Sequence, residues 1–177
     1  MRNDSVDVSW EAGADHVTSY KIRVKSGSNR EILQQEVSSR NRVFSISGLD
    51  AASKFRIEIG SKRQEKTSKM AFIVAQTLPN PPKVRVGKIE KDEVVMVITK
   101  PNHAVTGYIA LLEHTDRIGS RPRRIRIKKD SRKVKVNQLE PGAPYVFTII
   151  SLEGNLQSEE NQIEFSTRPA PLEKLRY

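Results

Sequence analysis

The chain has 177 residues, a net charge of +10 and no cysteine. The absence of cysteine excludes disulfides and thiolate metal sites, and with them disulfide-linked immunoglobulin domains. No apolar run approaches the roughly 20 residues of a membrane-spanning helix, so we expect no membrane contact within the chain. The positive charge favours acidic partners such as sulfated glycans, nucleic acid or anionic protein surfaces, without deciding the fold.

The first half is predicted to form β-strands, because apolar and polar residues alternate in short runs and no long run has the helical period. Strands are expected at residues 6–10, 20–24, 44–46, 55–59 and 72–77. A proline-rich segment, residues 78–82, follows them. Clustered prolines lack amide donors and interrupt a sheet, so this segment is predicted to separate two domains.

The second half repeats the pattern, with strands expected at residues 84–86, 94–98, 108–112, 125–127, 134–136, 145–149 and 163–165. Equivalent residues of the two halves lie 88 or 90 positions apart: Trp10 and Ile98, Tyr20 and Tyr108, Leu49 and Leu139, Phe55 and Tyr145, Thr77 and Thr167. Such a period is typical of independently folded tandem domains rather than of a solenoid. The predicted domains are residues 1–79 and 80–168, and residues 169–177 are a linker or the start of a following domain.

Several of these residues resemble the pattern of fibronectin type III domains. They are Trp10 with Tyr20, the spacing from Leu49 to Phe55, the sequence Leu139-Glu-Pro-Gly-Ala-Pro-Tyr145, and the Thr-x-Pro that closes each half. The resemblance implies an all-β fold of two tandem immunoglobulin-like β-sandwiches, with strands A, B and E in one sheet and C′, C, F and G in the other. It also implies a tyrosine corner at Tyr145, whose hydroxyl bonds backbone upstream. Phe55 departs from that pattern, and Ile98 stands where the family has tryptophan.

The first half begins almost at its strand B and has no room for a strand A, so we expect an open sheet edge there. The tail, residues 168–177, resembles a linker and the opening strand of another domain. The simplest interpretation is a fragment of a longer array. In the alternative, residues 171–177 of one molecule pair with the vacant edge of another and cause strand-exchange self-association.

Catalytic chemistry is not indicated. The three histidines, His16, His103 and His114, fall in or near predicted loops without a matching nucleophile or ligand spacing, and we interpret them as exposed polar residues. Phosphate-binding loops, nucleophile motifs and metal-binding histidine pairs are absent from the sequence. No catalytic residue, metal site or cofactor is therefore expected, although the parent protein could carry a catalytic domain elsewhere.

The outer face of the predicted C′CFG sheet differs between the two halves. In the first half alternation places charges there: Lys21, Arg23, Lys25, Lys54, Arg56 and Glu58. In the second half it places apolar residues there, of which Ile109, Leu111, Val146 and Ile150 are the predicted protein-binding residues. The alternative is that a neighbouring domain or the loop at residues 153–158 covers this surface.

The densest positive charge lies in residues 121–135. The predicted polyanion-binding residues are Arg121, Arg123, Arg124, Arg126, Lys128, Lys129, Lys133 and Lys135. Regularly spaced cations suit sulfates or phosphates, with heparan sulfate as the expected glycosaminoglycan. The alternative is a solvated strand whose charges block unwanted edge pairing. Nucleic acid is disfavoured, because no aromatic residues interleave with the cations to stack bases.

These features predict a non-catalytic, extracellular binding or spacer module of an adhesion protein or receptor, with a protein ligand and heparan sulfate as a possible co-ligand. The divergent tandem domains resemble the ectodomains of receptor-type tyrosine phosphatases and related cell-surface receptors. Asn3-Asp-Ser is a glycosylation sequon, which would make the protein a glycoprotein at Asn3. An intracellular cytoskeletal or muscle scaffold is the alternative, since it would explain the absence of cysteine.

Overall fold

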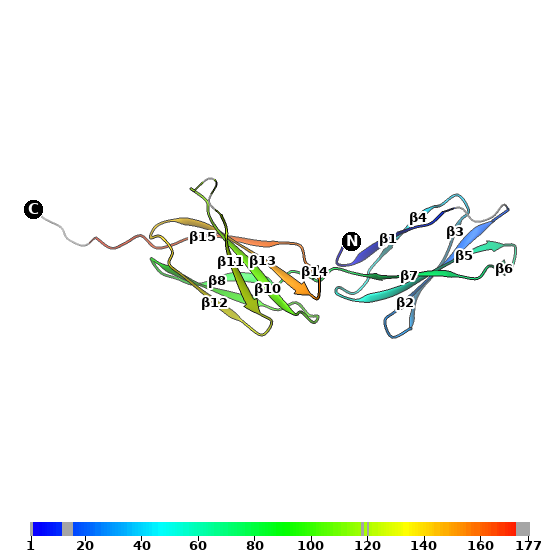
Figure 1. Ribbon diagram of the computed structural model, residues 1–177, viewed down its shortest axis with the longest axis horizontal. Helices are drawn as coiled ribbons and strands as arrows, with labels where there is room; N and C mark the ends of the chain where they lie inside the picture. Colours follow the sequence, from blue (N-terminus) through cyan, green and yellow to red (C-terminus); the bar gives the residue numbers. More distant parts are fainter. Residues whose placement is uncertain (1, 12–15, 118, 120, 173–177) are drawn as a thin grey trace, which may run out of the picture. The chain divides into compact units, whose positions relative to one another are not determined.

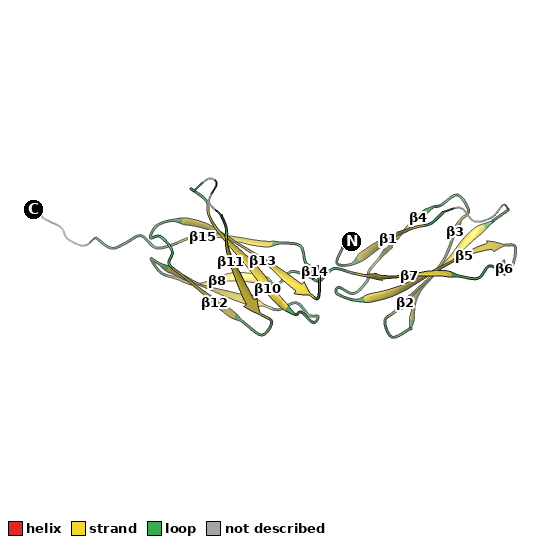
Figure 2. Ribbon diagram, viewed as in Figure 1, coloured by secondary structure: helices red, strands yellow, loops and turns green. Residues whose placement is uncertain are grey.

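The computed structural model describes residues 2–11, 16–117, 119 and 121–172, and these ranges contain only β-strands and loops (Figure 2). The all-β prediction is confirmed. The chain divides into two compact units, Met1–Leu78 and Pro79–Tyr177. No helix in the described ranges has the length and apolarity to span a membrane.

The described residues of the first unit form seven strands, which Figure 1 labels. They are β1 (Ser5–Ser9), β2 (Ser19–Ser26), β3 (Glu31–Ser38), β4 (Val43–Ser47), β5 (Lys54–Arg63), β6 (Lys66–Thr67) and β7 (Ala71–Gln76). One sheet pairs β1 with β4; the other has the order β3-β2-β5, and β6 and β7 both pair with β5. All of these pairings are antiparallel.

The second unit has the same plan with one more strand in its smaller sheet (Figure 1). Its strands are β8 (Lys83–Ile89), β9 (Glu93–Thr99), β10 (Gly107–His114), β11 (Arg123–Lys128), β12 (Lys133–Asn137), β13 (Pro144–Glu153), β14 (Leu156–Gln157) and β15 (Asn161–Ser166). The smaller sheet has the order β12-β9-β8, and the larger has β11-β10-β13 with β14 and β15 on β13. In sheet order, the smaller sheet consists of strands E, B and A and the larger sheet of C′, C, F and G, as expected.

A strand corresponding to β8 is not described in the first unit. There β1 occupies the place of β9, pairs with β4 on one side, and has no pairing partner among the described residues on the other. A strand with a pairing partner on only one side exposes unpaired amide and carbonyl groups along its other side.

Alternating side chains from the two sheets form a separate core in each unit. The described core of the first unit has ten buried apolar residues, among them Ile22, Ile46 and Ile57. The second has fourteen, including Met96, Tyr108 and Phe147, and Val84 and Val86 of β8 pack against it. Because burial of apolar area dominates folding energy, we expect the second unit to be the more stable.

The sequence repeat reappears in the hydrogen bonds. The Thr77 hydroxyl accepts a bond from the Ser53 amide (3.0 Å) and donates to the Asp50 carbonyl (2.6 Å). Thr167 repeats this 90 residues later, accepting from the Ala143 amide (3.0 Å) and donating to the Glu140 carbonyl (2.5 Å). Buried hydroxyls that tie the last strand to the turn before strand F therefore explain the threonine of each Thr-x-Pro.

The expected tyrosine corner is present in the second unit, where the Glu140 amide donates to the Tyr145 hydroxyl at 2.9 Å. Phe55 has the corresponding place and, lacking a hydroxyl, cannot make this bond.

The sequence prediction missed the two-residue strands β6 and β14 and one long strand, β3, which pairs with β2. Only Val37 of its eight residues is buried, and Ile32 is exposed, so the strand has almost no apolar alternation to detect.

Candidate binding surfaces

The outer face of the larger sheet in the second unit gathers the predicted protein-binding residues. Ile109 and Leu111 of β10 lie directly opposite Ile150 and Thr148 of β13, and Val146 follows on the same side of β13. The four apolar side chains are half-buried, and Thr148 is buried. We call these five residues the second-unit face. They form a continuous, mainly apolar stripe across the two central strands.

Polar strands border this stripe on both sides. On β11, Arg126 pairs with Ile109 and Arg124 with Leu111, and both arginines are exposed. On β15, Gln162 pairs with Thr148 and Glu164 with Val146. An apolar centre with a charged rim is the usual organisation of a protein interface, in which desolvation supplies affinity and rim charge supplies steering.

The alternative interpretation of this face from the sequence is that the loop at residues 153–158 covers it. Its strand β14 pairs with β13 only at Leu152 and Glu153, beyond the last residue of the second-unit face.

The structure divides the predicted polyanion-binding residues among different faces. Exposed Arg124, Arg126 and Lys128 alternate on β11 with Ile125 and Ile127, which lie on the core side. We call these three cations the β11 ladder. None of them has an ion-pair partner among the described residues.

The other five cations are placed differently. Lys133 and Lys135 belong to β12 in the opposite sheet, where Val134 and Val136 face the core, so the two lysines point to the other side of the sandwich. Lys135 also pairs with Glu93 at 2.6 Å, and Arg123 donates to the Asn137 carbonyl at 2.7 Å. Arg121 and Lys129 are exposed just outside the two ends of β11. Only the β11 ladder lies on one face beside the apolar stripe.

The corresponding face of the first unit is built around one buried carboxylate. Glu58 lies 2.9 Å from Arg56 Nε, 3.2 Å from Lys25 Nζ and 3.5 Å from Arg23 Nε. Burial raises the pKa of Glu58, but the hydrogen bonds and positive charges of these three side chains outweigh it and hold the pKa below its ordinary value. The carboxylate is therefore ionised at neutral pH and fixes three cations around it.

The first unit also exposes apolar side chains that the sequence analysis did not single out. On β7, Phe72, Ile73 and Val74 are 54%, 50% and 65% exposed. The Arg56 guanidinium covers the Phe72 ring at 3.7 Å from its centroid. A detectable signal was present, because β7 reads Ala-Phe-Ile-Val-Ala-Gln without a charge, whereas an edge strand usually carries charges that block pairing.

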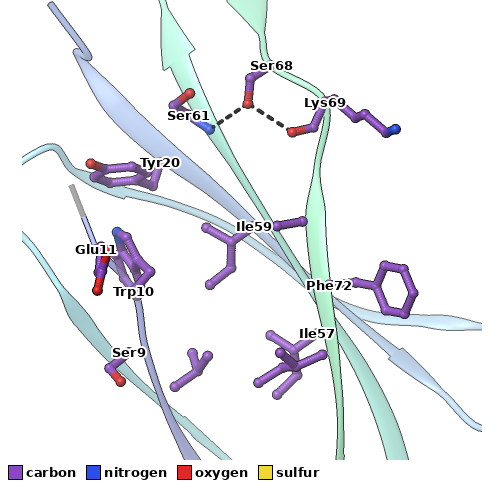
Figure 3. Close-up of a pocket in the computed structure, with 13 residues that line it drawn as sticks. Ser9, Trp10, Glu11, Tyr20, Ile57, Ile59, Ser61, Ser68, Lys69 and Phe72 are labelled. Carbon is purple, nitrogen blue, oxygen red and sulfur yellow. Dashed lines mark hydrogen bonds between the residues drawn. The ribbon is translucent and has the colours of Figure 1, made fainter. Parts of the chain in front are cut away.

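Behind β7 lies a hollow of about 300 Å³, open to solvent between β1 and β7. We call it the first-unit groove. Trp10, Tyr20, Ile57 and Ile59 line it, as Figure 3 shows, and the Phe72 ring points away from it.

The three histidines do not form a site. The interpretation of all three as exposed is wrong for His103, which is half-buried, and for His114. The His114 side chain is only 13% exposed and packs on Tyr145 with ring centroids 5.0 Å apart. His103 Nε2 accepts a hydrogen bond from the Asn80 amide at 2.8 Å. His16 is exposed. Among the described residues no cluster of three or more His, Asp or Glu side chains could hold a metal ion.

The predicted glycosylation site, Asn3, lies in the bend before β1 and is half-buried. The predicted exchange segment is described only as far as Leu172, which is 86% exposed, and residues 173–177 lie outside the described ranges.

Comparison with known proteins agrees with this architecture. No protein-family model matches the chain. It is similar to tenascin-N of Homo sapiens, with 22% identity over 163 residues, and to tenascin of Mus musculus, with 24% over 173 residues. These alignments cover 90% and 96% of this chain but only 12% and 8% of the relatives. Among solved structures, a segment of two fibronectin type III domains from chicken tenascin matches with a TM-score of 0.63 and 22% identity, over 94% of each chain.

Proposed function

We propose that this chain, which consists of two fibronectin type III domains in tandem, serves as a non-catalytic, extracellular binding module of a larger adhesion protein. The similarity to tenascins over nearly the whole chain supports this assignment, and the chain spans about a tenth of their length. Recognition then depends on exposed surfaces of the sandwiches rather than on a catalytic cleft.

The observation that carries the proposal is the second-unit face with its border of cations. Ile109, Leu111, Val146 and Ile150 form a partly exposed apolar stripe where the first unit has ion pairs, and the β11 ladder adjoins it. A stripe of this kind suits a protein partner with an apolar centre and an acidic rim.

Capture from solubilised cell-surface protein by immobilised chain tests this face. Leu111→Asp places a charge in the middle of the stripe and is expected to reduce capture of the acidic partner at least tenfold. Ile32→Asp introduces the same charge at an exposed apolar position of the first unit, and should leave capture unchanged. Near-ultraviolet circular dichroism checks that both variants are folded. Equal capture by folded Leu111→Asp and wild type would eliminate this surface.

Glycosaminoglycan binding is a second proposed property, and the β11 ladder supports it. Alternate residues of a strand lie about 6.6 Å apart, so the three cations form a regular row of charge. Changing all three to alanine should lower the salt concentration at which the chain leaves a heparin column. The control is the Arg85→Ala, Lys133→Ala, Lys135→Ala variant, which loses the same number of charges from the opposite sheet. Equal elution of the two variants would show that net charge alone retains the chain.

The extracellular assignment is tested separately from binding. Secretion of the chain from a mammalian host should give a product that carries a glycan on Asn3, seen as a mass shift that Asn3→Gln removes. An intracellular scaffold remains the competing class, and an unmodified Asn3 in the secreted chain would favour it. A parent related to receptor-type tyrosine phosphatases is a narrower proposal, which the sequence flanking this chain would decide.

Self-association through residues 171–177 is proposed as a further protein contact, independent of the second-unit face. The edge of β1 that has no pairing partner among the described residues supports it.

A further inference from the structure

The two borders of the second-unit face carry opposite charges. On one side lies the β11 ladder. On the other lie Glu164 of β15, which pairs with Val146, and Glu160, which directly precedes that strand. The Gln162 side chain donates to the Glu160 carboxylate at 3.2 Å, so the carboxylate lies on the outer side with Gln162 and Glu164. We call Glu160 and Glu164 the acidic edge.

Neither border is neutralised within the described chain. No ion pair between described residues includes a member of the β11 ladder or of the acidic edge. All five of these residues are exposed. In the first unit, by contrast, Glu58 pairs with three cations of its own face. Two unpaired borders of opposite sign favour a partner surface that carries the same charges in reverse order.

The second-unit face supplies that reversed order itself. A twofold rotation about an axis parallel to the strands, midway between β10 and β13, brings two copies of the face together with their borders exchanged. The β11 ladder of each copy then lies over the acidic edge of the other. Such an interface is isologous, because both copies contribute the same residues. The strands of both copies run in the same direction, which is the aligned arrangement of packed sheets.

The apolar stripe fits the same arrangement. Ile109 pairs with Ile150 and Leu111 with Thr148 across β10 and β13. Because β10 of one copy lies over β13 of the other, Ile109 faces Ile150 and Leu111 faces Thr148 between the copies as well. Leu111 is half-buried and Thr148 is buried, so a large side chain meets a low point of the facing surface.

The charged side chains are also brought within reach of one another. Arg126 is level with Ile109 and therefore lies over Glu160 of the other copy. Arg124, the next cation along β11, lies between Glu160 and Glu164 of the other copy. Glu113, which follows on the same side of β10, is a diagonal neighbour of Arg124 in its own sheet. Each arginine thus has a carboxylate beside it.

We propose that the second-unit face binds the same face of a second copy of this chain through this twofold arrangement. The inference rests on the proposed role of the face in protein binding and identifies its partner. Only four strands, about 4.8 Å apart, build the face. The interface is therefore small, and the dimer is expected to be weak, with a dissociation constant in the micromolar range or above.

Reversal of each border tests the twofold contact. The variant Arg124→Glu, Arg126→Glu has two acidic borders, and the variant Glu160→Arg, Glu164→Arg has two basic borders. Alone, each should have a dissociation constant at least tenfold above that of wild type, because like charges meet. Mixed in equal amounts, the two variants should associate again, since every border then meets its opposite. Sedimentation equilibrium of the full chain, from micromolar to near-millimolar concentration, measures the masses.

Net charge does not account for the expected pattern. Each variant changes the net charge of +10 by four, so both remain positive and repel each other. The control is Arg85→Glu, Lys133→Glu, which reverses two exposed cations on the opposite sheet and should associate like wild type.

The outcomes distinguish this inference from the other proposals. A wild-type chain that stays monomeric would overturn the second copy as partner, and loss of capture by Leu111→Asp would then still support a protein-binding face. Association that neither border reversal weakens would overturn this site and would agree with contact through residues 171–177. Association that each reversal weakens but the mixture does not restore would overturn the twofold arrangement.

Discussion

The two domains share one topology, but equivalent positions on the outer face of the larger sheet carry opposite chemistry. Arg23, Arg56 and Glu58 of the first unit form an ion-paired cluster. Their counterparts in the second unit are Leu111, Val146 and Thr148, which form the mainly apolar stripe.

Inward residues, by contrast, are apolar in both units: Ile57 corresponds to Phe147, and both are fully buried. The comparison teaches that the alternating core pattern specifies the sandwich, while the other face of each strand is free to differ. Function is therefore expected to differ between the two domains even though their fold does not.

The largest expected change in stability comes from truncating equivalent core side chains of the two units. Phe147→Ala should destabilise the second unit by about 3–5 kcal/mol and Ile57→Ala the first by about 2–5 kcal/mol, since each leaves a cavity. Urea unfolding followed by Trp10 fluorescence reports the first unit, and circular dichroism reports both. Ile57→Ala should move the Trp10 transition and Phe147→Ala should not. A Trp10 transition that moves equally with both variants would show a single cooperative unit.

A smaller effect is expected from the outer face. Glu58→Gln should destabilise the first unit by about 1–2 kcal/mol at neutral pH, because it leaves three cations without their shared carboxylate. The folded-state pKa of Glu58 is lowered, so its contribution is present above the unfolded pKa, near 4.5, and is lost as the pH falls through the folded pKa.

Urea titrations of wild type and Glu58→Gln should therefore differ at pH 7 and converge at strongly acid pH. Thr148→Val, at the equivalent position, is the control and should show no such convergence. A Glu58→Gln difference that persists unchanged in acid would rule out a charge effect.

The tyrosine corner can be removed from the second unit and added to the first. Each substitution is expected to change the free energy of unfolding of its unit by about 1 kcal/mol. Tyr145→Phe removes the hydroxyl that accepts from the Glu140 amide and should destabilise the second unit by about 0.5–1.5 kcal/mol. Phe55→Tyr places a hydroxyl at the same position of the first unit and should stabilise it by a similar or smaller amount. Equilibrium unfolding of each variant measures both. Destabilisation by Phe55→Tyr would mean that the first unit cannot accommodate the corner.

The smallest expected effects come from turns with a left-handed residue. Such residues recur at matched positions 90 apart, and each pair has glycine in one unit only: Gly48 and Gln138, Ala52 and Gly142, Gln64 and Gly154. Ala52→Gly should stabilise the first unit by about 0.5 kcal/mol, because relief of left-handed strain slightly exceeds the entropic cost of glycine. Gly142→Ala should destabilise the second unit. Thermal unfolding of both variants measures these stability changes. Destabilisation by Ala52→Gly together with stabilisation by Gly142→Ala would contradict the assignment of left-handed strain.

Prediction from sequence succeeded where burial alternates with a period of two. Strands such as β9 and β13 place nearly every predicted core residue inside, and the threonine and tyrosine patterns recur as hydrogen bonds. It missed β3, which is mostly solvated, and the buried side chain of His114, which depends on packing against a tyrosine 31 residues away. Neither feature leaves a local pattern to detect.

The sequence by itself determined the all-β class, the tandem repeat and which side of most strands faces a core, because local alternation encodes side-chain direction. Only the tertiary structure decided which surfaces those strands build. It joined Glu58 to three cations, separated the β11 ladder from Lys133 and Lys135, and opened a groove between β1 and β7. Such features arise from residues brought together by strand pairing and sheet packing. Alternation predicted that Arg23, Arg56 and Glu58 share an outer face, but it could not predict that their side chains contact one another.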